Sequence, residues 1–264
     1  LFDFSVFKSR NFSGAIMGSI GMNFSFWPFI IYLPLYFQSA LGYDAIHAGL
    51  ALLAYTLPTL IVPPFAERLS LRYQPRLVIP AGLFLIGLGF MLMRYASGLH
   101  DASWLTMLPG SLLAGIGLGL TNTPVTNTAT ASVSSSRAGM ASGIDMSARL
   151  ITLAINIALM GFILLESVLS SLKDSVAGIV SDTQLRLAAE MVAAGNLTGL
   201  AQRIPEIVRL DDAEALLHTA LVHGFGTVML YGGIGVWILA ALSYVIFGPK
   251  AAHQAAPAEV GKLL

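Results

Sequence analysis

The residues of this sequence best suited to chemistry are a carboxylate and a guanidinium that share one face of an apolar segment. Asp145, Arg149, Thr152 and Asn156 are spaced at i, i+4, i+7 and i+11, which places them in one stripe along a helix. An ionisable side chain at the centre of a membrane helix costs at least ~2.5 kcal/mol and marks a substrate or proton pathway by default. The order Asp before Arg at i, i+4 also favours a structural ion pair, so the two interpretations stand side by side.

Six apolar stretches dominate the 264-residue chain, at residues 12–37, 47–66, 77–96, 104–125, 138–165 and 216–247. Each reaches the ~20 residues that a helix needs to cross the hydrocarbon of a bilayer. The composition agrees, with 11% charged residues, 56% hydrophobic residues and a mean hydropathy of +0.77. We therefore expect an all-α, polytopic membrane protein whose six transmembrane helices form one bundle.

Basic residues alternate from one connection to the next. Eight of them fall on one side of the predicted bundle: Lys8, Arg10, Arg68, Arg72, Arg76, Arg137, Lys250 and Lys262. The short opposite connections, 38–46 and 97–103, hold no Lys or Arg, and only Arg94 lies near that side. By the positive-inside rule we expect both termini to be cytoplasmic. We expect the membrane itself to be the plasma (inner) membrane. The predicted organisation is five transmembrane helices in 1–165, an extracytoplasmic helical loop in 166–215, the sixth transmembrane helix in 216–247 and a cytoplasmic tail in 248–264.

The long loop carries its own helix signals. Ser181 and Gln184 have the spacing of a capping box, and Gly195 suits the end of the helix that this box would open. Asp211 and Glu214 suggest a second start, leading into the last membrane helix. The loop is either a docking surface for a partner or a packed plug without one.

Polar side chains are distributed unevenly among the predicted spans. The third span is almost bare, and the sixth has only scattered polar residues, so both are expected to face lipid. The other four spans carry more polar residues, including Tyr55 and Thr56 in the second. The candidate pathway residues are Asn23, Trp27, Tyr32, Tyr36 and Gln38 in the first, Asn122 and Thr126 in the fourth, and Asp145, Arg149, Thr152 and Asn156 in the fifth. Because polar groups facing lipid tails are costly, these four helices should surround a polar region. Gly115 and Gly119 in the fourth predict a close helix contact.

Other chemistries find no support in the sequence. The chain has no Cys, which excludes disulfides and thiol nucleophiles, and His218 and His223 are five residues apart, on different helix faces. We expect no metal, no cofactor and no enzyme activity, and the zero net charge offers no argument for nucleic acid. The first residue is Leu1 rather than Met, from which we expect a fragment or a processed product of a longer protein.

Several sequence blocks resemble the fourteen-helix drug:proton antiporters of the major facilitator superfamily. The blocks are Phe7-Lys8-Ser9-Arg10-Asn11-Phe12, Leu33-Pro34-Leu35-Tyr36-Phe37-Gln38 with Gly42 and Ala48-Gly49-Leu50, Leu108-Pro109-Gly110 with Gly115-Ile116-Gly117-Leu118-Gly119 and Pro124, and Arg137-Ala138-Gly139-Met140-Ala141-Ser142-Gly143 with Arg149. Their order is similar to that of the C-terminal six helices of such a transporter. The chain is thus expected to be a half-transporter.

The resemblance implies an exporter of hydrophobic or amphipathic small molecules, driven by proton entry and by rocking of two six-helix halves about a central cavity. It implies that the first, second, fourth and fifth helices of each half line that cavity. The implied partners are the N-terminal half, membrane lipids, a drug-like substrate and protons. In Gram-negative members a periplasmic adaptor completes the export path, which by analogy would give the long loop a use.

The connection before the third helix departs from the family pattern. Glu67, Leu71 and Gln74 stand where Gly, Asp and Gly are usual, while the gating-loop arginines Arg68, Arg72 and Arg76 remain. The usual latch acid is therefore missing, and the family's proton-coupling acids belong mainly to the other half.

Two alternatives to a working half-transporter remain open. One is a self-assembling or remnant six-helix bundle without independent transport. The other, remote, is an intramembrane serine protease, because Met140-Ala141-Ser142-Gly143 approaches its nucleophile motif. Ser142 and the two histidines His218 and His223 are expected at opposite membrane faces, too far apart for a Ser–His hydrogen bond.

Overall fold

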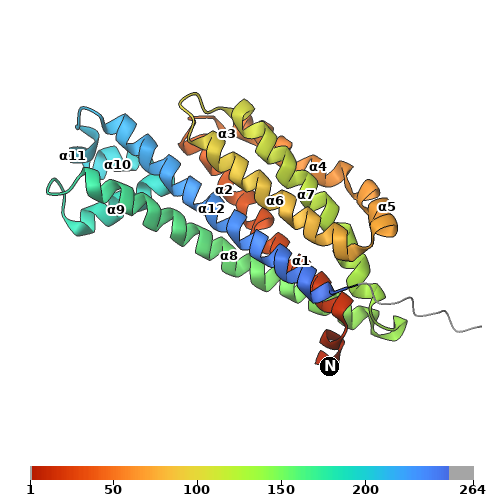
Figure 1. Ribbon diagram of the computed structural model, residues 1–264. Coiled ribbons are helices and arrows are strands. Elements are labelled where there is room, and N and C mark those ends of the chain that lie inside the picture. The colour runs from red at the N-terminus through yellow and green to blue at the C-terminus, as the bar shows by residue number, and fades with distance from the viewer. Residues whose placement is uncertain (1, 250–264) are drawn as a thin grey trace, which may run out of the picture.

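The computed structural model describes residues 2–249, and all regular structure within that range is helical (Figure 1). Five helices are long and apolar enough to cross a membrane, and a bent helix pair raises the number to six. The expectation of an all-α integral membrane protein is confirmed.

The first span consists of two helices, α1 (Arg10–Phe24) and α2 (Phe26–Ser39), which follow a short 3-10 turn at Phe4–Lys8. They meet at Ser25, whose backbone (φ −118°, ψ −71°) departs from helical values. Pro28 lies three residues further on and has no N–H to offer the preceding turn. The Ser25 hydroxyl donates to the Gly21 carbonyl at 2.8 Å. The break therefore leaves that carbonyl with a hydrogen-bond partner inside the membrane.

The second span is bent and longer than expected. It comprises α3 (Ala45–Thr56), α4 (Pro58–Ile61) and α5 (Pro63–Tyr73), with an angle of 47° at the break before Pro63. Proline at the first position of both α4 and α5 removes a backbone donor and starts a new helix instead of continuing the old one. We expected Arg68, Arg72 and Arg76 in a loop between the second and third spans. This was wrong, because Arg68 and Arg72 lie on α5 and Arg76 lies in the first turn of the next helix, α6 (Pro75–Ser97).

Helices α6 (Pro75–Ser97) and α7 (Trp104–Ala131) form the third and fourth spans. The glycines of α7 act as predicted. A Cβ added at Gly115 would lie 2.5 Å from the Tyr55 carbonyl oxygen, and one at Gly119 would lie 2.6 Å from the Cβ of Val62. The bent second span is thus held against α7 at a distance that only glycine allows.

The fifth and sixth spans extend beyond the others at one end of the bundle (Figure 1). Helix α8 (Ala138–Ser175) follows a 3-10 turn at Ser135–Arg137 and continues past residue 165, where its membrane segment was expected to end. Helix α12 (Ala213–Phe247) has 35 residues. At ~1.5 Å per residue such helices are well over the ~30 Å of the hydrocarbon core, so their ends project from it.

Three short helices, α9 (Asp182–Ala193), α10 (Leu197–Arg203) and α11 (Pro205–Val208), pack beside these projecting ends (Figure 1). The capping box of Ser181 and Gln184 is confirmed, and Gly195 follows α9 with a φ of +73°. The second start does lead into the last membrane helix, with Glu214 in the first turn of α12. The residue before α12 is Asp212 rather than Asp211, and its side chain makes no capping hydrogen bond.

The opposite end of the bundle gathers basic residues. Arg137 pairs with Asp3, and hydrogen bonds from Ser5 together with the charge of Arg137 lower the pKa of the Asp3 carboxyl. Arg76 donates from Nη1 to the Gly248 carbonyl oxygen at 2.9 Å, just past the end of α12. A cation at a helix C-terminus interacts favourably with the exposed carbonyl groups there. Lys250 and Lys262 lie outside the described residues, and the orientation of this end toward the cytoplasm stays a prediction.

Candidate functional site: a buried polar network

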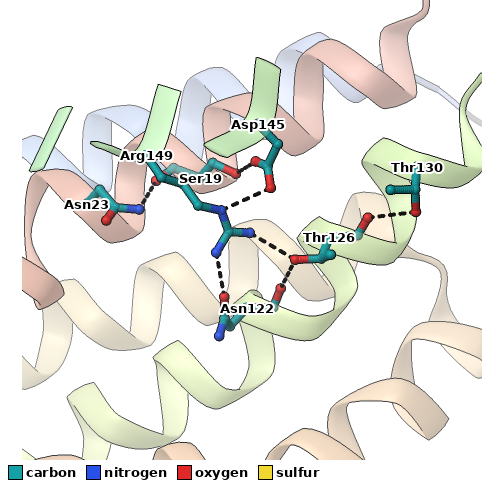
Figure 2. Close-up of polar contacts among 7 residues, drawn as sticks. All are labelled: Ser19, Asn23, Asn122, Thr126, Thr130, Asp145 and Arg149. Atoms are coloured by element: carbon teal, nitrogen blue, oxygen red, sulfur yellow. Dashed lines mark hydrogen bonds and ion pairs between the residues drawn. The ribbon is translucent and has the colours of Figure 1, made fainter. Parts of the chain in front are cut away.

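The centre of the candidate site is the ion pair between Asp145 and Arg149 on α8. Asp145 is only 5% exposed, and Arg149 donates from Nε to its Oδ2 at 3.0 Å. The Ser19 hydroxyl of α1 donates to the other carboxylate oxygen, Oδ1 (Figure 2). Both oxygens therefore have a donor, which a buried carboxylate requires to stay charged.

The remaining faces of the guanidinium point at α7. Arg149 donates from Nη1 to Asn122 Oδ1 at 2.7 Å and from Nη2 to the Thr126 hydroxyl at 3.0 Å (Figure 2). The planar fork of the arginine matches acceptors placed one helical turn apart. One side chain of α8 thus connects the carboxylate of its own helix with two residues of α7.

The partners of the ion pair are themselves hydrogen-bonded. The Thr126 hydroxyl accepts from Arg149 and donates to the Asn122 carbonyl at 3.3 Å, so it is used both as an acceptor and as a donor. On α1, Asn23 donates from Nδ2 to the Ser19 carbonyl at 2.9 Å. We define the polar network as Ser19, Asn23, Asn122, Thr126, Asp145 and Arg149; it links α1, α7 and α8.

Each member of the network has a hydrogen-bond partner, but the bonds between α8 and α7 go to side chains that can exchange partners. Arg149 holds α7 through an amide and a hydroxyl, both of which bind water or a substrate equally well. A polar ligand that competed for the Arg149 guanidinium would therefore remove its bonds to Asn122 and Thr126 and loosen the contact between α8 and α7.

Ser19 is the member of the network that the sequence did not single out. It lies four residues before Asn23, on the same face of α1, so the helical periodicity of the polar residues contained the signal. Four of the predicted pathway residues do come together in the network: Asn122, Thr126, Asp145 and Arg149. Asn23 joins them through Ser19.

Thr152 and Asn156 continue the stripe on α8 but lie outside the network. Asn156 is 3% exposed, donates to the Thr152 carbonyl at 2.9 Å and accepts from the Tyr231 hydroxyl at 2.6 Å. Tyr231 belongs to α12, so Asn156 is in the contact between α8 and α12. The sequence placed it on the same helix face as Arg149, and the structure gives it a different neighbour.

The other polar residues of the first span are scattered along α2. Tyr32 donates to the Ile157 carbonyl at 2.5 Å, Trp27 packs edge-on against Phe26, and Tyr36 is buried in contact with the ring of Phe225. Gln38 is exposed near the end of α2.

The polar residues of the second span bond to backbone groups. Tyr55 donates to the Phe26 carbonyl at 2.7 Å, and Thr56 donates to the Leu52 carbonyl within its own helix at 3.3 Å. The four polar spans therefore do not share one continuous set of contacts. Within the described residues the hydrogen-bonded network itself joins the first, fourth and fifth.

The arginines before the third span have separate surroundings. Arg68 is exposed, and Arg76 binds the end of α12. The guanidinium carbon of Arg72 lies 5.2 Å from the centroid of the Tyr73 ring. Gln74, which stands where a glycine is usual, has φ +71° and ψ 149°. This backbone region is accessible essentially to glycine alone, so Gln74 is strained.

The chain is similar to known transporters. The profile of the Major Facilitator Superfamily matches residues 4–170. Multidrug resistance protein Stp of Mycobacterium tuberculosis is 29% identical over 193 residues, which cover 73% of this chain and 35% of Stp. Quinolone resistance protein NorB of Staphylococcus aureus is 28% identical over 163 residues, which cover 61% of this chain and 35% of NorB. The matched region thus spans about a third of these relatives, and their family consists of transporters rather than enzymes, which sets the protease alternative aside. By its fold and by the match over residues 4–170, this chain belongs to the Major Facilitator Superfamily.

Proposed function

We propose that this chain acts as the C-terminal half of a proton-coupled efflux transporter for hydrophobic or amphipathic small molecules. The printed names of its relatives describe resistance to multiple drugs and to quinolones, which supports a drug-like substrate. The block pattern from Arg10 to Arg149 supports the C-terminal position. The polar network, buried between three membrane helices, is the observation that carries the proposal.

In this proposal the contacts of Asp145 and Arg149 change during transport. When Arg149 engages a substrate, it leaves Asn122 and Thr126, and α8 is released from α7. A proton on Asp145 loosens the ion pair within α8 and so frees Arg149 for such a ligand. The charge that remains would be costly in hydrocarbon unless the cavity admits water or substrate, so the exchange is coupled to opening. This coupling uses side chains of one half only, while the family's main proton-coupling acids are expected in the other.

The N-terminal half docks, in this proposal, on the exposed apolar faces of α3 and α8. Ile46 and Leu50 are 75% and 58% exposed on α3, and Leu150 and Ile155 are 57% and 53% exposed on α8. Such faces suit another helix bundle as well as lipid. The layer formed by α9, α10 and α11 would lie on the extracytoplasmic side and offer a surface to a periplasmic adaptor.

Expression of the chain with and without a partner tests the proposal. Cells that lack their own efflux pumps should extrude ethidium only when this chain and an N-terminal six-helix half of a related transporter are both present. Abolition of the pH gradient should stop this efflux. Proton-driven ethidium efflux by the purified chain alone, in vesicles, would instead establish the self-assembled bundle. No efflux with any N-terminal partner, at normal abundance of both halves, would favour the remnant.

A further inference from the structure

A cleft of about 480 Å³ opens between α6 and α12, next to the connection after α6. Arg94, Tyr95 and Ser97 line it from α6, and His223, Gly226 and Thr227 line it from α12. None of the network helices α1, α7 and α8 contributes to its walls. The cleft is therefore a separate feature on the two spans that carry the fewest polar residues.

The cleft is cationic. Arg94 is exposed and makes no ion pair with any residue in the range 2–249. Its aliphatic stem lies along α12, since a Cβ added at Gly226 would be 3.8 Å from Arg94 Cγ. His223 is also exposed and adds a ring N–H at the same wall. A guanidinium beside a second donor is the arrangement that binds phosphate oxygens.

Aromatic residues mark the depth of the cleft in the membrane. Arg94 is in the last turn of α6, next to Tyr95, which is 70% exposed. Trp104, at the first position of the neighbouring α7, is 47% exposed. Exposed Tyr and Trp at helix ends are typical of the interface between hydrocarbon and headgroups. The Arg94 guanidinium is therefore level with lipid headgroups, while its stem extends into the apolar region.

An exposed apolar strip leads from the cleft toward the other end of the bundle. Phe84 of α6 is 50% exposed, and Ile234 and Ile238 of α12 are 45% and 56% exposed. Trp237 stacks on Phe84 at 5.7 Å between ring centroids and donates from Nε1 to the Phe84 carbonyl at 3.0 Å. Phe84 lies ten residues before Arg94, a rise of ~15 Å along the helix. A cation at headgroup depth above an apolar strip of this length has the shape of a phospholipid site.

We propose that this cleft binds an anionic phospholipid, with its phosphate on Arg94 and His223 and an acyl chain along Phe84 and Ile234. Free phosphate shares the headgroup chemistry but would leave the strip unused, so the lipid is the expected occupant. The leaflet is the extracytoplasmic one if the topology proposed above holds. Binding itself requires only insertion in a membrane and does not depend on transport.

Quenching by brominated lipid tests the site, because Trp237 lies beside the strip. A variant with Trp27→Phe and Trp104→Phe keeps Trp237 as the sole tryptophan. The purified full chain is reconstituted in phosphatidylcholine vesicles that contain a minority of phosphatidylglycerol brominated on its acyl chains. We expect Trp237 to be quenched as if this lipid were enriched about fivefold beside it, which is the preference expected from one arginine near anionic headgroups. Arg94→Gln should remove the enrichment.

Arg209→Gln is the matched control, because Arg209 is exposed beyond α11 and does not line the cleft. It should leave the enrichment unchanged, and circular dichroism should show equal helix content in all variants. Equal quenching by brominated phosphatidylcholine, or enrichment that persists in Arg94→Gln, would overturn the proposal. Absence of enrichment in the wild-type chain, together with a shift of its thermal unfolding by inorganic phosphate that Arg94→Gln does not show, would also overturn it, in favour of a free-anion site.

Discussion

Removal of Arg149 is the sharpest test of the polar network. In Arg149→Ala the carboxylate of Asp145, 5% exposed, keeps the Ser19 hydroxyl as its only side-chain donor among residues 2–249. Asn122 and Thr126 lose a donor at the same time. Breaking a buried ion pair on one side costs ~3–5 kcal/mol, because the remaining charge has no compensation. We expect a loss of this size in the free energy of unfolding.

The double variant Asp145→Asn with Arg149→Gln separates charge from contacts. With both charges gone, only ordinary hydrogen bonds are lost or rearranged, at about 1 kcal/mol. Arg68→Ala serves as the control, because Arg68 is exposed on α5 and such surface changes stay within about 0.5 kcal/mol. Titration of the purified proteins with SDS, followed by circular dichroism, measures the three differences. Equal losses in Arg149→Ala and in the double variant would refute the argument from uncompensated charge.

The same variants distinguish a structural pair from a functional one in the assembled transporter. The double variant retains abundance in either case. Wild-type efflux would show that Asp145 and Arg149 carry no chemistry, whereas absent efflux at normal abundance would place them in the transport step. Asp145→Asn alone should change the pH dependence of efflux if the carboxylate exchanges protons. An unchanged profile would contradict its role in coupling.

Three further predictions concern the backbone, the packing and the topology. Gln74→Gly should raise the free energy of unfolding by about 1 kcal/mol in the SDS titration. The substitution removes a backbone strain of ~1–3 kcal/mol, and the greater freedom of glycine in the unfolded chain offsets part of this gain. An unchanged free energy of unfolding would mean that Gln74 is unstrained. Gly115→Leu should lower the free energy of unfolding by at least ~2 kcal/mol in the same titration, because its Cβ would lie 2.5 Å from a carbonyl oxygen of α3. Gly139→Leu, with open space around it, should be nearly neutral. Similar losses in both variants would contradict the α3–α7 contact. Cysteine labelling from outside intact cells should modify Asn196→Cys and spare Arg137→Cys, and equal labelling of both would refute the predicted helix count.

The sequence determined the membrane spans because their signals are local. An apolar stretch of sufficient length must become helical to satisfy its backbone groups in lipid, whatever its neighbours are. The prolines at 58, 63 and 64 and the capping box at Ser181 likewise act within a few residues of themselves. The spacing of Asp145 and Arg149 fixed their shared face and their mutual ion pair through the helical period alone.

The tertiary structure decided which helix each polar face meets. Ser19 and Asp145 are 126 residues apart, Asn156 and Tyr231 are 75 apart, and Arg76 and Gly248 are 172 apart. In a membrane an apolar side chain is equally well placed against lipid or against another helix, so hydrophobicity does not select the partner. Close glycine contacts and matched donors and acceptors select it, and these depend on how the whole bundle packs. For this reason the sequence predicted the stripe on α8 as one site. In the structure Asp145 contacts α1, Arg149 contacts α7 and Asn156 contacts α12.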